Sequence, residues 1–500
     1  MAWKNDLQEP YDVAYNFTED ELISIRPEDV ASYMNLQTYG TSAPDITDRP
    51  THCRSTNLEF IKKSISYFSP NRNASWNVEH KSGNPTRSVV VNNVIKGVRL
   101  FEVRKEGLPS SAKRDMKRAE FELTMHIFET GGNDSYKTRV LPTMMKLQYH
   151  LIGRTDDISN IETDDIHSHP KFSDFALETE VSWSKNVMDE RECPPQIIVG
   201  SQNPKFCCLV SLASHLESRL SSNDQSRFLF GSTGRVDDDE PNRINDKYTK
   251  CLRQVWKNNQ EMRELLVQNK GGLGSHSIRK FGATWSAEHG CSYIEVEIRG
   301  RWRGKKNGRV VNRYINPEQL PIDTKVAGIL TVGGPVKYKV KEDSYVTHQF
   351  LIDSVVPSIA VHYTDESNHI ASVLGPALLW ACHTEDDCLQ AIVPDDLRER
   401  VKSTYNNIRG GHPGDYNPVE KLPLHIYRVE NEVHIEEMIT MLDGGVREGV
   451  GQGGMQFGGT AGGQQAIIEQ HLQSTVLAQH RIETLVRENH AQVQVRFALF

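Results

Sequence analysis

The chain has 500 residues, of which 37% are hydrophobic and 25% are charged, a balance that favours a folded protein over a disordered one. No run of about eighteen apolar residues occurs, so we expect no membrane span, and the first residues lack the basic-then-apolar order of a secretory signal. The eight cysteines are scattered without a CxxC pair, which argues against a zinc ribbon or finger.

The net charge of −8 conceals two basic segments. Residues 51–120 hold 14 lysines and arginines against 6 acidic residues, and residues 241–320 hold 16 against 7. Charge fluctuates along any chain, but two basic segments in an otherwise acidic protein favour two faces that bind one polyanion, such as DNA or RNA.

The first part of the chain predicts helices. Residues 1–54 are acidic and rich in turn formers, and we expect them to be extended or partly disordered. Residues 55–109 carry apolar residues three and four apart, which is typical of amphipathic helices. A linker with Ser110 or Ser111 as a helix cap leads to two further helices, at 114–129 and 137–153.

The pattern changes after Arg154. Apolar and polar residues alternate over 175–187, which predicts a half-buried strand, and 193–200 predicts a second short strand. Residues 204–220, 246–269 and 395–416 predict helices, whereas 325–340 predict extended chain. The expected fold class is therefore mainly α with a small antiparallel β-sheet, an α+β fold.

These elements divide the chain into six expected parts. They are a partly disordered N-terminal segment (1–54), a helical domain (55–109), a mixed α/β domain (110–325), a region without an assigned role (326–443), a Gly-rich linker (444–465) and a polar helix (466–500).

One group of residues in the mixed domain suggests chemistry. His276 and Arg279 stand three residues apart at the start of a predicted helix, and alone they indicate no more than an exposed helical turn. The other members are Arg154, Asp157, Lys185, Trp302 and Tyr314. Each has an ordinary explanation when taken singly: an arginine at a helix end neutralises the helix dipole, and isolated aromatic residues are often buried in a core.

Taken together, the seven residues match a known order. The sequence resembles the tyrosine recombinase family over residues 55–320, most closely its Crypton-type branch from eukaryotic mobile elements. The family order is an arginine, an acid three residues later, a lysine in a hairpin, HxxR, a histidine or tryptophan, and the tyrosine. Lys171 and Lys205 are alternatives for the lysine. The sequence departs from the family at two positions. Residues 299–302 are RGRW, so the histidine-or-tryptophan position must be the tryptophan, Trp302. Asn312 and Arg313 stand directly before the tyrosine.

The resemblance implies a role for each residue. Tyr314 would be the nucleophile that forms a 3′-phosphotyrosyl bond, and Arg154 and Arg279 would hold the phosphate oxygens. Lys185 would protonate the leaving oxygen and His276 would assist proton transfer at the tyrosine. Trp302 would donate to the phosphate or support the site, and Asp157 would orient a catalytic side chain.

The resemblance also implies double-stranded DNA as the partner, a homotetramer on that DNA, a helical core-binding domain and no cofactor or metal. The lysines and arginines expected to contact DNA are Lys113, Arg114, Lys117, Arg301, Arg303, Lys305, Lys306 and Arg309. A mobile-element integrase or excisionase would act in the nucleus.

Other interpretations stay open at this point. A DNA-binding protein that has kept the recombinase fold and lost strand exchange is the main alternative; a type IB topoisomerase and a non-enzymatic adaptor are less favoured. Asp164, Asp165, His167 and His169 contain metal-ligand types, but no further ligand is evident, so a solvated loop is favoured there.

Overall fold

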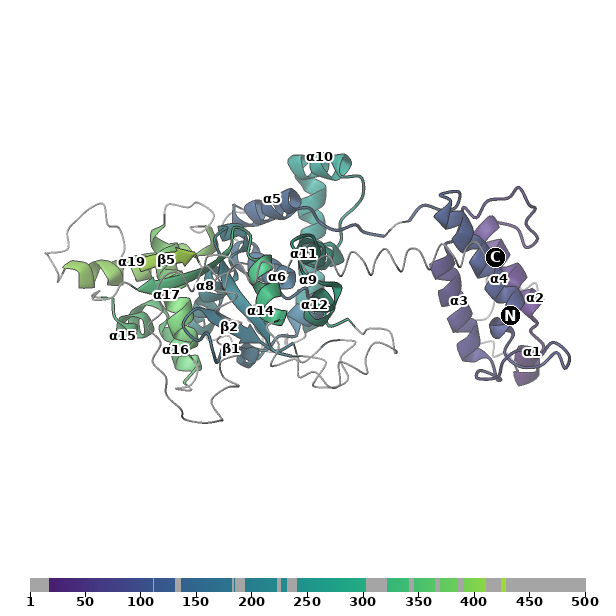
Figure 1. The fold of residues 1–500 in the computed structure, drawn as a ribbon, viewed down its shortest axis with the longest axis horizontal. Helices are drawn as coiled ribbons and strands as arrows, with labels where there is room; N and C mark the ends of the chain where they lie inside the picture. The colour runs from purple at the N-terminus through teal and green to yellow at the C-terminus, as the bar shows by residue number, and fades with distance from the viewer. Residues whose placement is uncertain are drawn as a thin grey trace, which may run out of the picture. The chain divides into compact units, whose positions relative to one another are not determined.

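The computed structural model describes residues 18–110, 112–130, 136–181, 184, 194–222, 226–231, 241–302, 322–340, 346–364, 369–384, 391–410 and 424–428. Their buried apolar residues form two separate cores, one of helices alone and one of helices with a sheet. Figure 1 shows the elements that make up each.

The smaller unit is helical. It contains α1 (Glu19–Ile23), α2 (Pro27–Tyr39), α3 (Ser55–Phe68), a short 3-10 turn (Pro85–Arg87) and α4 (Val89–Val103). Its core residues recur at helical spacing on α2, α3 and α4, as in Val91, Ile95 and Val98.

Helix α2 corrects the expectation that residues 1–54 are an appended, partly disordered segment. Thr18 caps α1 in a capping box, and Pro27 occupies the first turn of α2, where its missing N–H costs nothing. Val30 and Met34 of α2 are buried in the same core as Leu58. The helical unit therefore begins before residue 55.

The larger unit is built around α6 (Leu141–His150), every residue of which is buried. The chain enters it through α5 (Arg118–Glu129) and leaves α6 through the short helix α7 (Thr155–Ser159). The α-helices that the structure describes between there and residue 330 are α8 (Cys208–Ser221), α9 (Pro241–Asn258), α10 (Gln260–Gln268), α11 (His276–Glu288), α12 (Tyr293–Arg299) and α14 (Ile322–Leu330).

Among the described residues, the sheet has five strands in the order β1-β2-β3-β4-β5, and every pair of neighbours is antiparallel. The strands are β1 (Ile166–Ser168), β2 (Ala176–Thr179), β3 (Gln196–Ser201), β4 (Pro335–Val340) and β5 (Leu424–Arg428). All six residues of β3 are buried, because helix α8 packs against it. The predicted fold class, helices with a small antiparallel sheet, is confirmed.

The region after residue 325 joins the same core. It contributes α15 (His348–Phe350), a π-helical turn (Leu351–Val355), α16 (Pro357–His362), α17 (Ile370–His383) and α19 (Asp395–Gly410). Helix α17 lies beside α8 (Figure 1) and contacts both α8 and β4. Its Leu374 and Leu378 are fully buried. A domain boundary at 325 would cut through this core.

Two local predictions for this region fare differently. The segment 325–340, expected to be extended, is the end of helix α14 followed by strand β4. The helix predicted from residue 395 is α19. The expected Gly-rich linker (444–465) and polar helix (466–500) lie outside the described residues. Within the part of the chain that the structure describes, no helix is both long and apolar enough to cross a membrane.

Candidate active site

Asp157 is the centre of the site. It lies in the first turn of α7, is 1% exposed, and accepts a hydrogen bond from the backbone N–H of Arg154 at 2.9 Å. The chain reaches this position through a tight turn after α6, in which Ile152 has φ +44°. A Cβ at Gly153 would come within 2.7 Å of Ile158 Cδ1, so a larger residue here would have to displace the end of that side chain.

Two arginines from distant parts of the chain meet on the Asp157 carboxylate. Nη1 of Arg279 lies 3.3 Å from Oδ2, and Nη2 of Arg301 lies 3.4 Å from the same oxygen. Both guanidinium groups are nearly inaccessible to solvent. The pKa of Arg279 is lowered to about 10, first by burial and then by the neighbouring arginines, while Asp157 opposes the change.

Arg279 is further held by its surroundings. It donates a hydrogen bond from Nη2 to the carbonyl of Gly300, and its guanidinium lies over the Trp302 ring, 4.5 Å from the centroid. Trp302 thus contacts an arginine of the site. This is the supporting role that the sequence allows for it.

Arg154 presents an unused donor. It precedes α7 in extended conformation and is half-buried. Its Nη1 is buried and has no hydrogen-bond partner among the described residues. A buried guanidinium N–H without a partner is costly, and an oxyanion placed there would satisfy it.

His276 begins helix α11 at the rim of the same group and is exposed to solvent. Its pKa is lowered from 6.5, first by partial burial and then by the positive charges of Arg279 and Arg154. The imidazole is therefore neutral at pH 7 and has a nitrogen free to accept a proton.

The structure corrects the expectation that Arg301 contacts DNA. Its side chain is 1% exposed, and besides Asp157 it donates to the side-chain oxygen of Gln196 on β3. Arg299, which the sequence analysis did not single out, is equally buried and pairs with Asp323 of α14 at 2.5 Å. These two arginines hold elements together, and no local sequence signal separates them from surface arginines.

The basic segment before α5 also contains both partly buried and exposed cationic side chains. Arg114 pairs with the buried carboxylate of Glu120, so its charge serves the fold, and Lys117 pairs with Asp115 at 2.7 Å on the surface. Lys113 is exposed and lies beside Gly272 and Gly274, in the loop that leads to His276. Of these three predicted DNA contacts, Lys113 and Arg114 both lie against the loop before His276, and Lys113 is the exposed one of the two.

Several predicted residues are not described. Tyr314, Lys185, Arg303, Lys305, Lys306 and Arg309 lie outside the described residues. Of the alternative lysines, Lys171 is exposed next to β1, and Lys205 lines a shallow hollow with Arg118 and Glu122. Among the described residues, no group of three or more histidine, cysteine or carboxylate side chains has the arrangement of a metal site.

The arrangement is suited to binding an oxyanion beside a neutral imidazole. Arg154, Asp157, His276, Arg279 and Trp302, which span nearly 150 residues of sequence, belong to one cluster. A scan of the chain against protein-family models and a search of curated proteins both find no match.

Proposed function

We propose that this protein cleaves and rejoins DNA strands through a phosphotyrosyl intermediate, as tyrosine recombinases do. The observation that carries the proposal is the convergence of Arg154, His276 and Arg279 around Asp157. In this proposal the smaller helical unit is a core-binding domain and the larger unit is the catalytic domain.

Phosphate binding follows from the two arginines. Arg154 and Arg279 would each donate to a non-bridging oxygen of the scissile phosphodiester, where negative charge increases in the transition state. Asp157 and Trp302 fix the Arg279 guanidinium before the substrate arrives, so little reorganisation is needed on binding.

The covalent step uses the residues that match the tyrosine recombinase order. The Tyr314 hydroxyl oxygen would attack phosphorus and give its proton to the neutral His276. The bond from phosphorus to the 5′-oxygen would break, and Lys185 would protonate that oxygen. The bond formed to Tyr314 replaces the bond broken, so a 5′-hydroxyl can attack it and rejoin the strand without an external energy source.

The partners and setting of this reaction are part of the proposal. Strand exchange between two duplexes needs several active sites, which favours a homotetramer on double-stranded DNA. The two basic segments would face that DNA, and integration or excision of a mobile element would take place in the nucleus.

A nicked suicide substrate tests the chemistry. The full chain should form a covalent protein–DNA adduct, visible as a shifted band on a denaturing gel. Tyr314→Phe should abolish the adduct and keep DNA binding, because the phenol ring remains and only the nucleophilic oxygen is lost. Arg279→Lys should reduce the adduct rate about 100-fold or more, since lysine cannot reproduce the guanidinium fork.

Tyr293→Phe is the matched control, because Tyr293 is 85% exposed on α12 and has no place in the mechanism. It should form the adduct at the wild-type rate. DNA binding by the wild-type chain without any adduct would overturn the enzyme and favour a DNA-binding protein that has lost strand exchange.

A further inference from the structure

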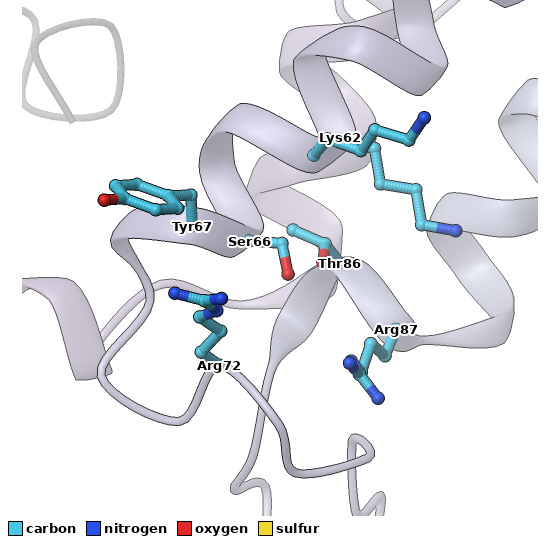
Figure 2. A pocket seen from close by; sticks show the side chains of 7 residues that line it. Lys62, Ser66, Tyr67, Arg72, Thr86 and Arg87 are labelled. Atoms are coloured by element: carbon cyan, nitrogen blue, oxygen red, sulfur yellow. The ribbon is translucent and has the colours of Figure 1, made fainter. Parts of the chain in front are cut away.

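A basic hollow lies in the smaller helical unit, and none of its lining residues belongs to the proposed active site. It encloses about 440 Å³ between the end of α3 and the turn before α4. Figure 2 shows Tyr67 and Arg72 on one side, Lys62 and Arg87 on the other, and Ser66 and Thr86 between them. Lys63 also lines it, so the lining carries four cationic side chains and no carboxylate.

Asn84 joins the segments that line this hollow. It is fully buried, and its amide nitrogen donates to Ser66 Oγ at 2.8 Å and to the carbonyl of Arg72 at 3.0 Å. Its amide oxygen accepts from the backbone N–H and the hydroxyl of Thr86, at 3.0 and 2.8 Å. The amide of Asn84 thus connects α3, the following loop and the turn before α4 by hydrogen bonds. These bonds hold the segments that carry the cationic side chains in fixed positions.

An aromatic ring stands at the edge of these cations. Tyr67 is 64% exposed, although burying its ring elsewhere would be favourable. The Arg72 guanidinium lies over it at 5.2 Å from the centroid, and Phe68 meets it edge-on at 5.2 Å. These contacts orient the ring and leave most of it open to solvent.

We infer that this hollow binds single-stranded nucleic acid, with successive backbone phosphates among the cations and an unpaired base stacked on Tyr67. Cations alone would suit any polyanion, but an exposed oriented ring next to them is the arrangement that holds unstacked bases. In a duplex the base faces are covered by their neighbours, so the ring would have nothing to stack on. The inference goes beyond the proposed strand exchange and does not depend on Tyr314.

Fluorescence anisotropy with the full chain tests the inference. The probes are a single-stranded oligothymidine and an oligouridine of about 12 nucleotides each and a duplex of the same length. Both single strands should bind more tightly than the duplex, and the pair shows whether DNA or RNA is preferred. Tyr67→Leu should weaken single-strand binding about 10-fold, the loss of one stacked base, and leave duplex binding unchanged.

Charge removal gives an independent measurement. The double variant Arg72→Gln, Arg87→Gln should lower the slope of log affinity against log salt by about 1.4 for the single strands, because two phosphate contacts are lost. Both side chains are exposed, so the variant should fold. The matched controls are Tyr293→Leu for the ring and Lys96→Gln with Arg104→Gln for the charge; all three residues are exposed and none lines the hollow.

The outcomes are distinct. Equal or tighter binding of the duplex, together with no effect of Tyr67→Leu, would overturn the inference, as would equal displacement of the oligonucleotides by an acidic polypeptide of the same charge. Tyr314→Phe should bind single strands like the wild-type chain. A missing phosphotyrosyl adduct would therefore contradict the proposed function and leave this inference standing.

Discussion

Asp157 is the residue on which the candidate site depends. Its carboxylate is shared by Arg279 and Arg301, and it also caps the backbone at Arg154. A buried carboxylate between two buried guanidinium groups is well stabilised, but removing its charge leaves both cations in a low-dielectric environment.

We therefore predict that Asp157→Asn lowers the free energy of unfolding by about 3 kcal/mol, because the buried cations lose the charge they share. Urea denaturation followed by tryptophan fluorescence measures the change. Adduct formation should fall more than the folded fraction does, since Arg279 loses the anchor that directs it.

Asp164→Asn is the matched control. Its side chain is 87% exposed and pairs with His362 at 3.0 Å on the surface, so its loss should change the free energy of unfolding by less than about 0.5 kcal/mol. Equal effects of the two substitutions would show that Asp157 does not anchor the arginines.

Two buried histidines contribute to the response of the fold to acid. Burial lowers the pKa of His150 and of His215 from 6.5 to about 3 in each case. Below pH 6.5 the unfolded chain binds protons that the folded chain does not, so stability falls as the pH falls from 6.5 towards 3. Each histidine contributes a slope of about 1.4 kcal/mol per pH unit in this window.

His150→Gln should remove one such slope, because glutamine does not titrate and keeps an N–H for the Phe206 carbonyl that His150 contacts at 2.7 Å. The measurement is the free energy of unfolding at several pH values between 6 and 4.5. His126→Gln, at an exposed position of α5, should leave the slope as it is in the wild-type chain. An unchanged slope in His150→Gln would contradict the prediction.

At the scale of elements, the helices after residue 325 support the fold of the larger unit. Glu217 of α8 is buried and accepts hydrogen bonds from the backbone of Ser358 and Ile359, at the start of α16, and from Arg400 of α19 at 2.8 Å. A carboxylate at a helix N-terminus satisfies free N–H groups and complements the helix dipole. One side chain thus joins three helices across the boundary that the sequence predicts.

Leu378→Ala in α17 should consequently destabilise the larger unit as a whole, by about 2 to 5 kcal/mol, because it opens a cavity in a shared core. Hydrogen exchange should show lost protection in α6 and α8 as well as in α17. Val361→Ala, at a position 76% exposed, is the control and should cost less than about 0.5 kcal/mol. Lost protection confined to α17 would show a separate unit.

At the scale of the whole molecule, periodic patterns could be predicted from the sequence and long-range pairings could not. Helices α3, α4, α5 and α8 follow from apolar spacing alone. The segment 246–269 was predicted as one helical stretch, but Asn259 accepts a hydrogen bond from the Met262 N–H and starts a second helix. The acidic composition of residues 1–54 concealed α2, although Pro27 is a readable start signal.

The candidate site shows the same division. His276, Arg279, Arg154 and Asp157 could be chosen because a family order links them, and the structure brings them together. The basic run around Arg301 predicts a surface contact with DNA, but its counter-charge, Asp157, lies 144 residues earlier in the chain. The residues next to an arginine in the sequence do not indicate an ion pair with a distant residue. Buried and exposed arginines therefore cannot be told apart from local composition.

The shared core after residue 325 has a consequence for synthesis on the ribosome. The core of the smaller helical unit is complete once residues up to α4 have emerged, so that unit can fold early. The larger core needs α17 and residues as late as Tyr405, so it cannot close until most of the chain has been translated. A prematurely terminated chain ending near residue 345 would keep every residue of the proposed active site and still lack the part of the larger core that α17 and α19 supply.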